Sequence, residues 1–191
     1  MDKHYIFVTS VPFKRPSLLS LLAEAGVKRG SISFQGDTMG SFTAEASLVP
    51  SIDKVLTALH EDLGGDIGML CSHGLGQFEM SIYLDALRYF PNEVCFPSDI
   101  LLRKMAYGDF SFFGALAKIF RDIPGELLNT AKTYLICGLD AKMAAKKLSV
   151  HRNTFNYRLN AFIGKTDLDI RDFHNALLLQ LYLDLSVGRS H

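Results

Sequence analysis

The chain has 191 residues, 48% of them hydrophobic, and its 20 basic residues balance 20 acidic residues. This length suits one large domain or two small ones, and the apolar content is enough for a packed core, which excludes a disordered chain. Because no apolar run is long enough to cross a bilayer, no signal-peptide pattern opens the sequence and the three cysteines are widely spaced, we expect a cytoplasmic protein with reduced thiols and no membrane partner.

The first 100 residues alternate between strand and helix patterns. Strands are predicted at 4–10, 31–35, 41–48, 67–72 and 94–96, and helices at 18–25, 52–63 and 78–89. Ser17 and Ser51 are the expected N-caps of the first two helices, and Gly64 is expected to end the second. The resulting order, β-α-β-β-α-β-α-β, predicts an antiparallel sheet with helices packed on one face.

Residues 101–122 form a predicted helical connector with four phenylalanines: Phe110, Phe112, Phe113 and Phe120. These side chains either pack domains or subunits together or complete a core, and the sequence leaves both interpretations open. Further on, Pro124 opens a helix that runs to about Ile136. Asp140 is expected to cap the next helix. Asp169 is expected to cap the last helix, with Asp172 making the reciprocal hydrogen bond of a capping box. The predicted fold class is α+β, with an α+β domain at 1–100, the connector at 101–122 and an all-α domain at 123–191.

The segment from Leu135 to Leu185 carries the most informative pattern, which indicates a helix-turn-helix. The small side chains of Ala144 and Ala145 allow two helices to approach closely, and Leu148 and Val150 bracket a tight turn. The second helix then places apolar residues at i, i+4, i+7 and i+8 on one buried stripe: Phe155, Leu159, Phe162 and Ile163. Arginine and asparagine side chains fall largely outside this stripe.

Charge is distributed unevenly along the chain. Residues 141–165 contain six basic residues and no acidic one, whereas the rest of the chain has 14 basic against 20 acidic residues. A solvated helix face normally interleaves Glu and Asp with its basic residues, so their complete absence favours phosphate binding. We therefore predict that this segment binds double-stranded DNA.

The predicted DNA contacts divide by chemistry, because ammonium groups neutralise phosphates whereas Arg and Asn can pair with guanine and adenine edges in the major groove. The expected phosphate contacts are Lys142, Lys146, Lys147 and Lys165, and the expected base contacts are Arg152, Asn153, Asn156 and Asn160. His151 is expected either to donate to a phosphate or to cap its helix. Tyr157 and Arg158 either contact the DNA backbone or brace the helix pair, and Thr154 is expected to face the preceding helix or its own backbone.

The run from Ala145 to Leu159, AKKLSVHRNTFNYRL, resembles the C-terminal DNA-binding domain of the PucR/CdaR family of bacterial transcriptional regulators. The resemblance continues through residues 169–172 and the apolar helix at 176–183. It departs at Phe162, where Ile is expected, and at Asp167, where Gly is usual. It covers about the last third of the chain and implies DNA binding that activates or represses operons, often for catabolism of a small molecule. The element order of the first 100 residues is similar to the degenerate GGDEF-like domain that precedes this domain in the same family.

Signals for catalysis are weak. The run Gln35–Met39 lies where the motif of a GGDEF cyclase would lie, but Asp37 is followed by Thr, and a two-metal site needs clustered carboxylates. Cys71 and His73 would share one side of a strand, without a metal-binding spacing to support them. We therefore predict no enzyme activity, no cofactor and no metal.

Together these patterns predict a sequence-specific DNA-binding transcriptional regulator, of a catabolic or stress operon, with a non-catalytic N-terminal domain. One helix-turn-helix makes a small interface, so we expect a homodimer that reads two half-sites, with a small-molecule effector as a further partner. Two alternatives stay open. One is a ligand-sensing module for a nucleotide or small metabolite, and the other is an interaction protein whose basic helix contacts an acidic protein.

Overall fold

The computed structural model describes residues 2–72 and 76–187 and divides the chain after Phe110 into two compact units. Unit 1 comprises residues 1–110, and unit 2 comprises residues 111–191. The division falls inside the predicted connector, while the predicted limits of the domains stay predictions. Within the described ranges, no helix combines the length and the apolar character that crossing a membrane requires.

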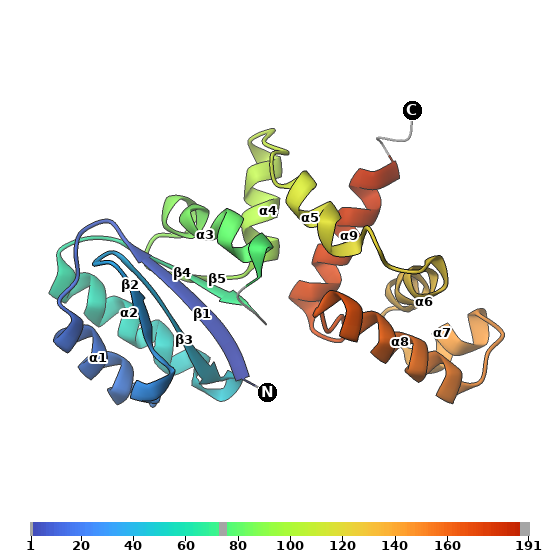
Figure 1. Ribbon diagram of the computed structural model, residues 1–191, viewed down its shortest axis with the longest axis horizontal. Coiled ribbons are helices and arrows are strands. Elements are labelled where there is room, and N and C mark those ends of the chain that lie inside the picture. Colours follow the sequence, from blue (N-terminus) through green and yellow to red (C-terminus); the bar gives the residue numbers. More distant parts are fainter. Residues whose placement is uncertain (1, 73–75, 188–191) are drawn as a thin grey trace. The chain divides into compact units, whose positions relative to one another are not determined.

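Unit 1 is built on a five-stranded sheet in the order β2-β3-β1-β4-β5 (Figure 1). The strands are β1 (Asp2–Thr9), β2 (Ser33–Gln35), β3 (Met39–Glu45), β4 (Ile67–Ser72) and β5 (Val94–Cys95). β1 pairs antiparallel with both β3 and β4, and β2 pairs antiparallel with β3. β5 runs parallel to β4, because a helical crossover separates these two strands in the chain. The sheet is therefore antiparallel except at its β5 edge.

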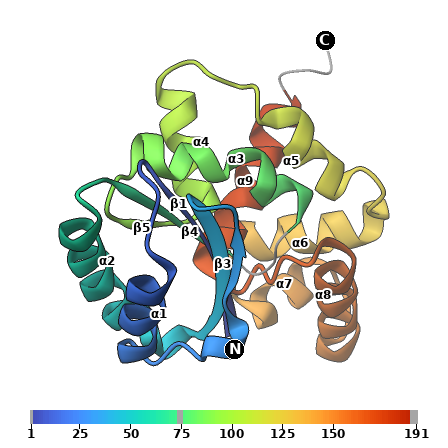
Figure 2. The ribbon, with the colours of Figure 1, turned by 60° about the vertical axis from the view of Figure 1, so that its left-hand side comes forward.

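One face of the sheet is covered by α1 (Arg15–Glu24) and α2 (Val49–Leu63) (Figure 2). Alternate residues of the strands point to this face, so Tyr5 and Cys71 are buried in the same cluster as Leu22 and Leu56. The ring of Tyr5 stacks on that of Phe42 across the β1–β3 pair, with 4.8 Å between the centroids. Burial of these apolar side chains is the main force that holds the helices on the sheet.

The opposite face packs against α3 (Gln77–Tyr89) and α4 (Pro97–Ala106) (Figure 2). The intervening strand residues Ile6, Val8 and Leu70 are buried as well, so the sheet is apolar on both faces. At Gly68 the approach is closest, because a Cβ there would lie 2.1 Å from the backbone nitrogen of Leu87. The expectation that helices cover only one face is thus wrong. Apolar and polar residues do not alternate clearly along these strands, because both faces of the sheet are buried.

Prolines, not serines, open the first two helices. α1 begins at Arg15 and α2 at Val49, each has a proline in its first turn, and neither has a side-chain N-cap. The predicted caps, Ser17 and Ser51, therefore lie inside their helices. Proline suits the first turn because its missing N–H would have no partner there. Gly64 ends α2 as predicted, in the left-handed conformation with φ 64°.

The residues considered for cyclase or metal chemistry take part in structural interactions instead. Asp37, on the β2–β3 turn, lies 3.7 Å from the guanidinium of Arg15 in an exposed ion pair. Cys71 is buried in the core, while His73 lies outside the described residues. Across the ranges that the structure describes, no group of three or more His, Cys, Asp or Glu side chains is placed to hold a metal ion. That unit 1 is a GGDEF-like domain stays a prediction.

Unit 2 is helical: α5 (Phe113–Phe120), α6 (Gly125–Ile136), α7 (Ala141–Lys147), α8 (Arg152–Thr166) and α9 (Phe173–Val187). Its core contains stacked rings, with Phe120 centred 6.3 Å from Phe162 and 4.4 Å from Tyr182. Phe113 also stacks on Tyr182, with 6.3 Å between the centroids, so Phe113 and Phe120 of the predicted connector contribute to the core of unit 2. The same stack explains why an aromatic residue occupies position 162, where the resemblance led us to expect isoleucine.

Candidate nucleic-acid interface

The first helix of the predicted pair, α7, packs closely against its neighbours (Figure 1). Asp140 caps it as predicted, because its carboxylate accepts hydrogen bonds from the amides of Lys142 at 2.7 Å and Met143 at 2.9 Å. Ala144 and Ala145 are buried where α7 contacts α6 and α8. Their small side chains let the helix backbones approach, which fixes the position of α8.

A tight turn connects α7 to α8, and one residue in it has an unusual backbone conformation. Ser149 adopts φ 55°, in the left-handed region that favours glycine. The amide of Val150 donates back to the carbonyl of Ala145, which stops α7 and redirects the chain. The turn therefore sets the angle at which α8 leaves α7.

α8 buries one side completely. Phe155, Leu159 and Phe162 are 0%, 4% and 0% exposed, while Ile163, at the margin of the predicted stripe, is half-buried. The ring of Phe155 meets that of Tyr134 on α6, with 5.8 Å between centroids. Burial raises the pKa of the Tyr134 phenol above its ordinary value. This apolar anchoring determines which side of α8 remains available to a partner.

The polar residues predicted to touch DNA lie on the remaining surface of the helix pair. The exposed residues include the candidate phosphate contacts Lys142, Lys146, Lys147 and Lys165 and the candidate base contacts Arg152, Asn153 and Asn160. Asn156 is half-buried, because it lies at the border of the buried stripe. Asn153 and Asn160, seven positions apart on α8, share the middle of the exposed side.

Tyr157 occupies the middle of the same side and is 75% exposed, so it does not brace the helix pair. Thr154 is also exposed, so it does not face the preceding helix, while the alternative that it faces its own backbone stays a prediction. The sequence contained a signal for this exposure, because Thr154 lies one helical turn before Tyr157 and therefore near the same side of α8. Thr154 therefore joins the candidate contacts that the sequence analysis missed.

His151 caps α8. Its Nδ1 accepts a hydrogen bond from the amide of Asn153 at 3.2 Å, and the side chain is exposed. With Nδ1 acting as acceptor, the neutral ring carries its proton on Nε2, which can donate outward. The capping role and the role as a phosphate donor, which the sequence posed as alternatives, are thus compatible in one geometry.

Arg158 differs from the other basic residues of the segment. Its guanidinium forms an ion pair with the carboxylate of Glu126 on α6, and its side chain is only 23% exposed. This ion pair braces α8 against α6, and a contact of Arg158 with the DNA backbone stays a prediction. In contrast, no carboxylate of the described residues lies within ion-pair distance of Lys142, Lys146, Lys147, Arg152 or Lys165.

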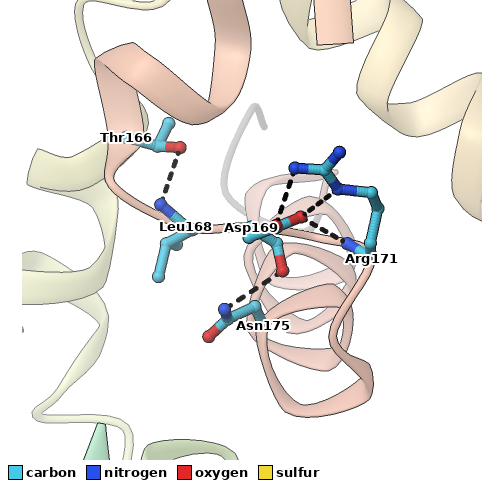
Figure 3. A network of polar contacts seen from close by, with 5 residues as sticks. All are labelled: Thr166, Leu168, Asp169, Arg171 and Asn175. Atoms are coloured by element: carbon cyan, nitrogen blue, oxygen red, sulfur yellow. Dashed lines mark hydrogen bonds and ion pairs between the residues drawn. The ribbon is translucent and has the colours of Figure 1, made fainter. Parts of the chain in front are cut away.

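The far end of α8 is held by a polar network (Figure 3). Thr166 accepts a hydrogen bond from the amide of Leu168 at 3.2 Å, and Asp169 pairs with Arg171, whose Nε lies 2.7 Å from the carboxylate. Asn175 donates to the carbonyl of Asp169 at 3.1 Å. Hydrogen bonding to Asp169 raises the pKa of the Arg171 guanidinium. The network joins the end of α8 to the start of α9.

Two expectations about this turn are resolved by the structure. Asp167 adopts φ 56° as the C-cap of α8, which explains why glycine is usual at this position and why Asp, which tolerates the left-handed region, can replace it. The predicted cap of α9 is wrong. Asp172, not Asp169, accepts from the amides of His174 at 3.0 Å and Asn175 at 3.4 Å, because α9 begins only at Phe173.

The formal charges of the two units are opposite in sign. Unit 1 contains nine basic and 13 acidic residues, and unit 2 contains 11 basic and seven acidic residues. Within unit 2, the segment 141–165 contributes six of the basic residues and no acid. A positive surface that flanks an exposed helix with Arg and Asn side chains is suited to a polyanion with hydrogen-bonding edges, which describes duplex DNA.

Comparisons with known proteins agree with this geometry. Residues 127–185 match the family model of the PucR C-terminal helix-turn-helix domain. The chain is 43% identical over 60 residues to the proline-responsive transcriptional activator PutR of Bacillus subtilis (strain 168), covering 31% of this chain and 14% of PutR. It is also 38% identical over 53 residues to the uncharacterized protein YxkF of the same organism, covering 28% of this chain and 18% of YxkF. The matches thus span less than a fifth of either relative.

Among solved structures, the chain is similar to a regulator of polyketide synthase expression from Bifidobacterium adolescentis, with a TM-score of 0.50 and 19% identity. That comparison covers 100% of this chain and 82% of the other, and at this identity it concerns the fold alone. Unit 2 contains a helix-turn-helix DNA-binding domain, the kind of domain that transcriptional regulators use. More particularly, residues 127–185 are a PucR C-terminal helix-turn-helix domain.

Proposed function

We propose that this protein is a sequence-specific transcriptional regulator that places α8 in the major groove of duplex DNA. The observation that carries the proposal is the sidedness of α8. Phe155, Leu159 and Phe162 are buried, whereas Asn153 and Asn160 are exposed on the other side and Arg152 is exposed at the start of the helix. In this arrangement the Arg and Asn side chains read base edges, and His151 and the N-terminal amides of α8 meet a phosphate.

In this proposal the exposed lysines set affinity and not sequence preference. Lys142, Lys146, Lys147 and Lys165 have no carboxylate partner among the described residues, so their charge is available to phosphates. Each phosphate neutralised releases condensed counterions and makes binding depend on salt. Arg158, already paired with Glu126, contributes less than the other basic residues.

The biological setting follows by similarity. PutR is a proline-responsive activator, which supports control of a catabolic operon in response to a small molecule. We propose that the protein acts as a homodimer, since one helix-turn-helix reads too few base pairs for strong specificity and two units would read two half-sites. We propose no catalytic activity for the chain. Because it would act on DNA, we propose that it functions in the cytoplasm.

The test begins by sequencing the DNA fragments that the purified protein retains from a random pool. Binding of the preferred site and of random duplex is then compared for the native protein, Asn153→Ala and Lys147→Ala. Asn153→Ala should cost about 1–3 kcal/mol on the preferred site and far less on random DNA. Lys147→Ala should weaken both equally and reduce the salt slope by about one. Equal losses on both DNAs for Asn153→Ala would contradict base reading by α8.

A further inference from the structure

An open hollow of about 440 Å³ lies in unit 1, away from the DNA-binding domain in sequence and within one compact unit. Arg88 and Tyr89, from the end of α3, and Tyr107 and Asp109, which follow α4, line it. Their chemistry is that of a recognition site: two aromatic rings, one guanidinium and one carboxylate.

The aromatic wall of the hollow is already stacked. The rings of Tyr89 and Tyr107 lie 5.8 Å apart with an interplanar angle of 15°, and the guanidinium of Arg88 lies 5.1 Å from the centre of the Tyr89 ring. Tyr107 is nevertheless 70% exposed. A ring with one face stacked and so much of its surface open can accept a second planar group by stacking.

Arg88 supplies a positive charge to the hollow. No carboxylate of the described residues pairs with it, although its guanidinium is held over Tyr89. A guanidinium stacked on a ring keeps the N–H groups at its edge for hydrogen bonds, and these match a carboxylate or phosphate in a two-point geometry. The hollow therefore combines a stacking surface with an anion donor.

The turn that carries Tyr107 and Asp109 is held in place before any ligand binds. Lys104 is 7% exposed, and its ammonium lies 3.0 Å from Asp85 on α3 and 2.8 Å from Asp109. The amide of Asp109 donates to the carbonyl of Lys104 at 2.9 Å, and Gly108 between Tyr107 and Asp109 has φ 73°. Charge pairing and a tight turn thus hold Tyr107 and Asp109 in place, so that a ligand would meet a formed site.

We propose that Arg88, Tyr89, Tyr107 and Asp109 bind a planar aromatic ligand that carries an anionic group. The ring stacks on Tyr107, and the anion pairs with Arg88. The Asp109 carboxylate, which can accept more than one hydrogen bond, accepts one from an amino group on the ring. Two kinds of molecule share this chemistry, a nucleotide with an amino-bearing base and an amino-substituted aromatic carboxylate. The site lies wholly in unit 1, so it does not rest on the proposed DNA-binding function.

Isothermal titration calorimetry on the full chain tests the proposal. The probes are AMP, GMP and 4-aminobenzoate, with ribose 5-phosphate and inorganic phosphate as anions that lack the ring. At least one aromatic anion should bind, and the ringless anions should not. Binding of the nucleotides alone assigns the site to nucleotides, and binding of 4-aminobenzoate alone assigns it to aromatic carboxylates.

Variants then locate the site. Arg88→Gln and Tyr107→Leu should each weaken the bound probe about tenfold or more, because each removes one of the two principal contacts. Tyr107→Phe keeps the ring and should retain binding. Arg103→Gln is the matched control, since Arg103 lies over the ring of Phe90 at 5.2 Å outside the hollow and should not affect binding.

Three results would overturn the proposal. The first is that none of the aromatic anions binds at millimolar concentration. The second is that the ringless anions bind as well as the aromatic ones, or that Arg88→Gln and Tyr107→Leu leave binding unchanged. The third is that Tyr107→Leu, followed by sedimentation velocity, changes the self-association of the chain without changing ligand binding, which would make the stacked tyrosines a subunit contact.

Discussion

The guanidinium of Arg158 on α8 forms an ion pair with the carboxylate of Glu126 on α6. This contact ties one flank of the proposed recognition helix to the first turn of a helix that also packs on it through Tyr134 and Phe155. It also neutralises the one basic residue of the 141–165 segment that is half-buried along α8. The remaining basic side chains of the segment have no such ion pair among the described residues.

Removing the Arg158–Glu126 pair should affect stability more than DNA recognition. Because Glu126 is 60% exposed, a double-mutant cycle with Arg158→Ala and Glu126→Ala should give a coupling of about 0.5 kcal/mol in urea unfolding at low salt. The coupling should fade in high salt, where screening is stronger. A loss of DNA affinity for Arg158→Ala as large as that for Lys147→Ala would contradict the bracing role.

The His151 cap gives a second prediction. His151→Ala removes the acceptor for the Asn153 amide and should lower the free energy of unfolding by about 1 kcal/mol. His151→Asn restores a capping acceptor and should recover most of that stability. If the ring also donates to a phosphate, the Asn variant should bind DNA more weakly than the native protein although its stability is restored. Fluorescence anisotropy on the preferred site and thermal unfolding measure the two effects.

The turn between α7 and α8 is open to stabilisation. Ser149→Gly should raise the free energy of unfolding by about 0.5–1 kcal/mol, because glycine adopts the observed φ of 55° without the penalty of a Cβ. Ser149→Val should lower it by a larger amount, since a β-branched residue resists this conformation. Chemical denaturation of the two variants under identical conditions provides the comparison, and equal effects would show that backbone strain is absent at this turn.

Lys104 should stabilise unit 1 over a defined pH range. Burial by itself lowers the pKa of this amine, but its hydrogen bonds to Asp109 and Asp85 outweigh burial and raise it. The stabilisation is therefore complete below the ordinary lysine pKa of about 10.4 and is lost as the pH rises through the higher folded value. Lys104→Met should cost about 3 kcal/mol at pH 7 because it leaves two carboxylates together. Urea unfolding at pH 7 and at a pH above the raised pKa of Lys104 should show a smaller difference between native and variant at the alkaline pH.

The contact between β4 and α3 should tolerate no side chain at position 68. Gly68→Ala places a Cβ about 2.1 Å from the backbone nitrogen of Leu87, so the helix has to move away from the sheet. We expect a loss of stability of about 3 kcal/mol or more, at the upper end of overpacking effects. Gly30→Ala is the control, because nothing lies within 4 Å of a Cβ there. Similar thermal midpoints for the two variants would contradict the close approach.

Local patterns in the sequence were sufficient where the determining interaction lies within a few residues. The cap at Asp140, the C-cap at Gly64 and the buried stripe of Phe155, Leu159 and Phe162 were all predicted, because helix periodicity and capping depend on neighbours in the chain. The caps of α1, α2 and α9 were misplaced, because a serine, proline or aspartate near a helix start competes with other residues for the same role.

The lack of acids between residues 141 and 165 and the spacing of the apolar stripe were enough to predict a basic, one-sided helix pair from the sequence alone. What only the tertiary structure decided is which polar side chains that pair leaves available. Arg158 forms an ion pair with Glu126, 32 positions earlier, and Thr154 is exposed. In unit 1, helices cover both faces of the sheet. Periodicity fixes the side of a helix that is apolar, but the partner of each charged residue is set by contacts between segments distant in the chain, which no local pattern contains.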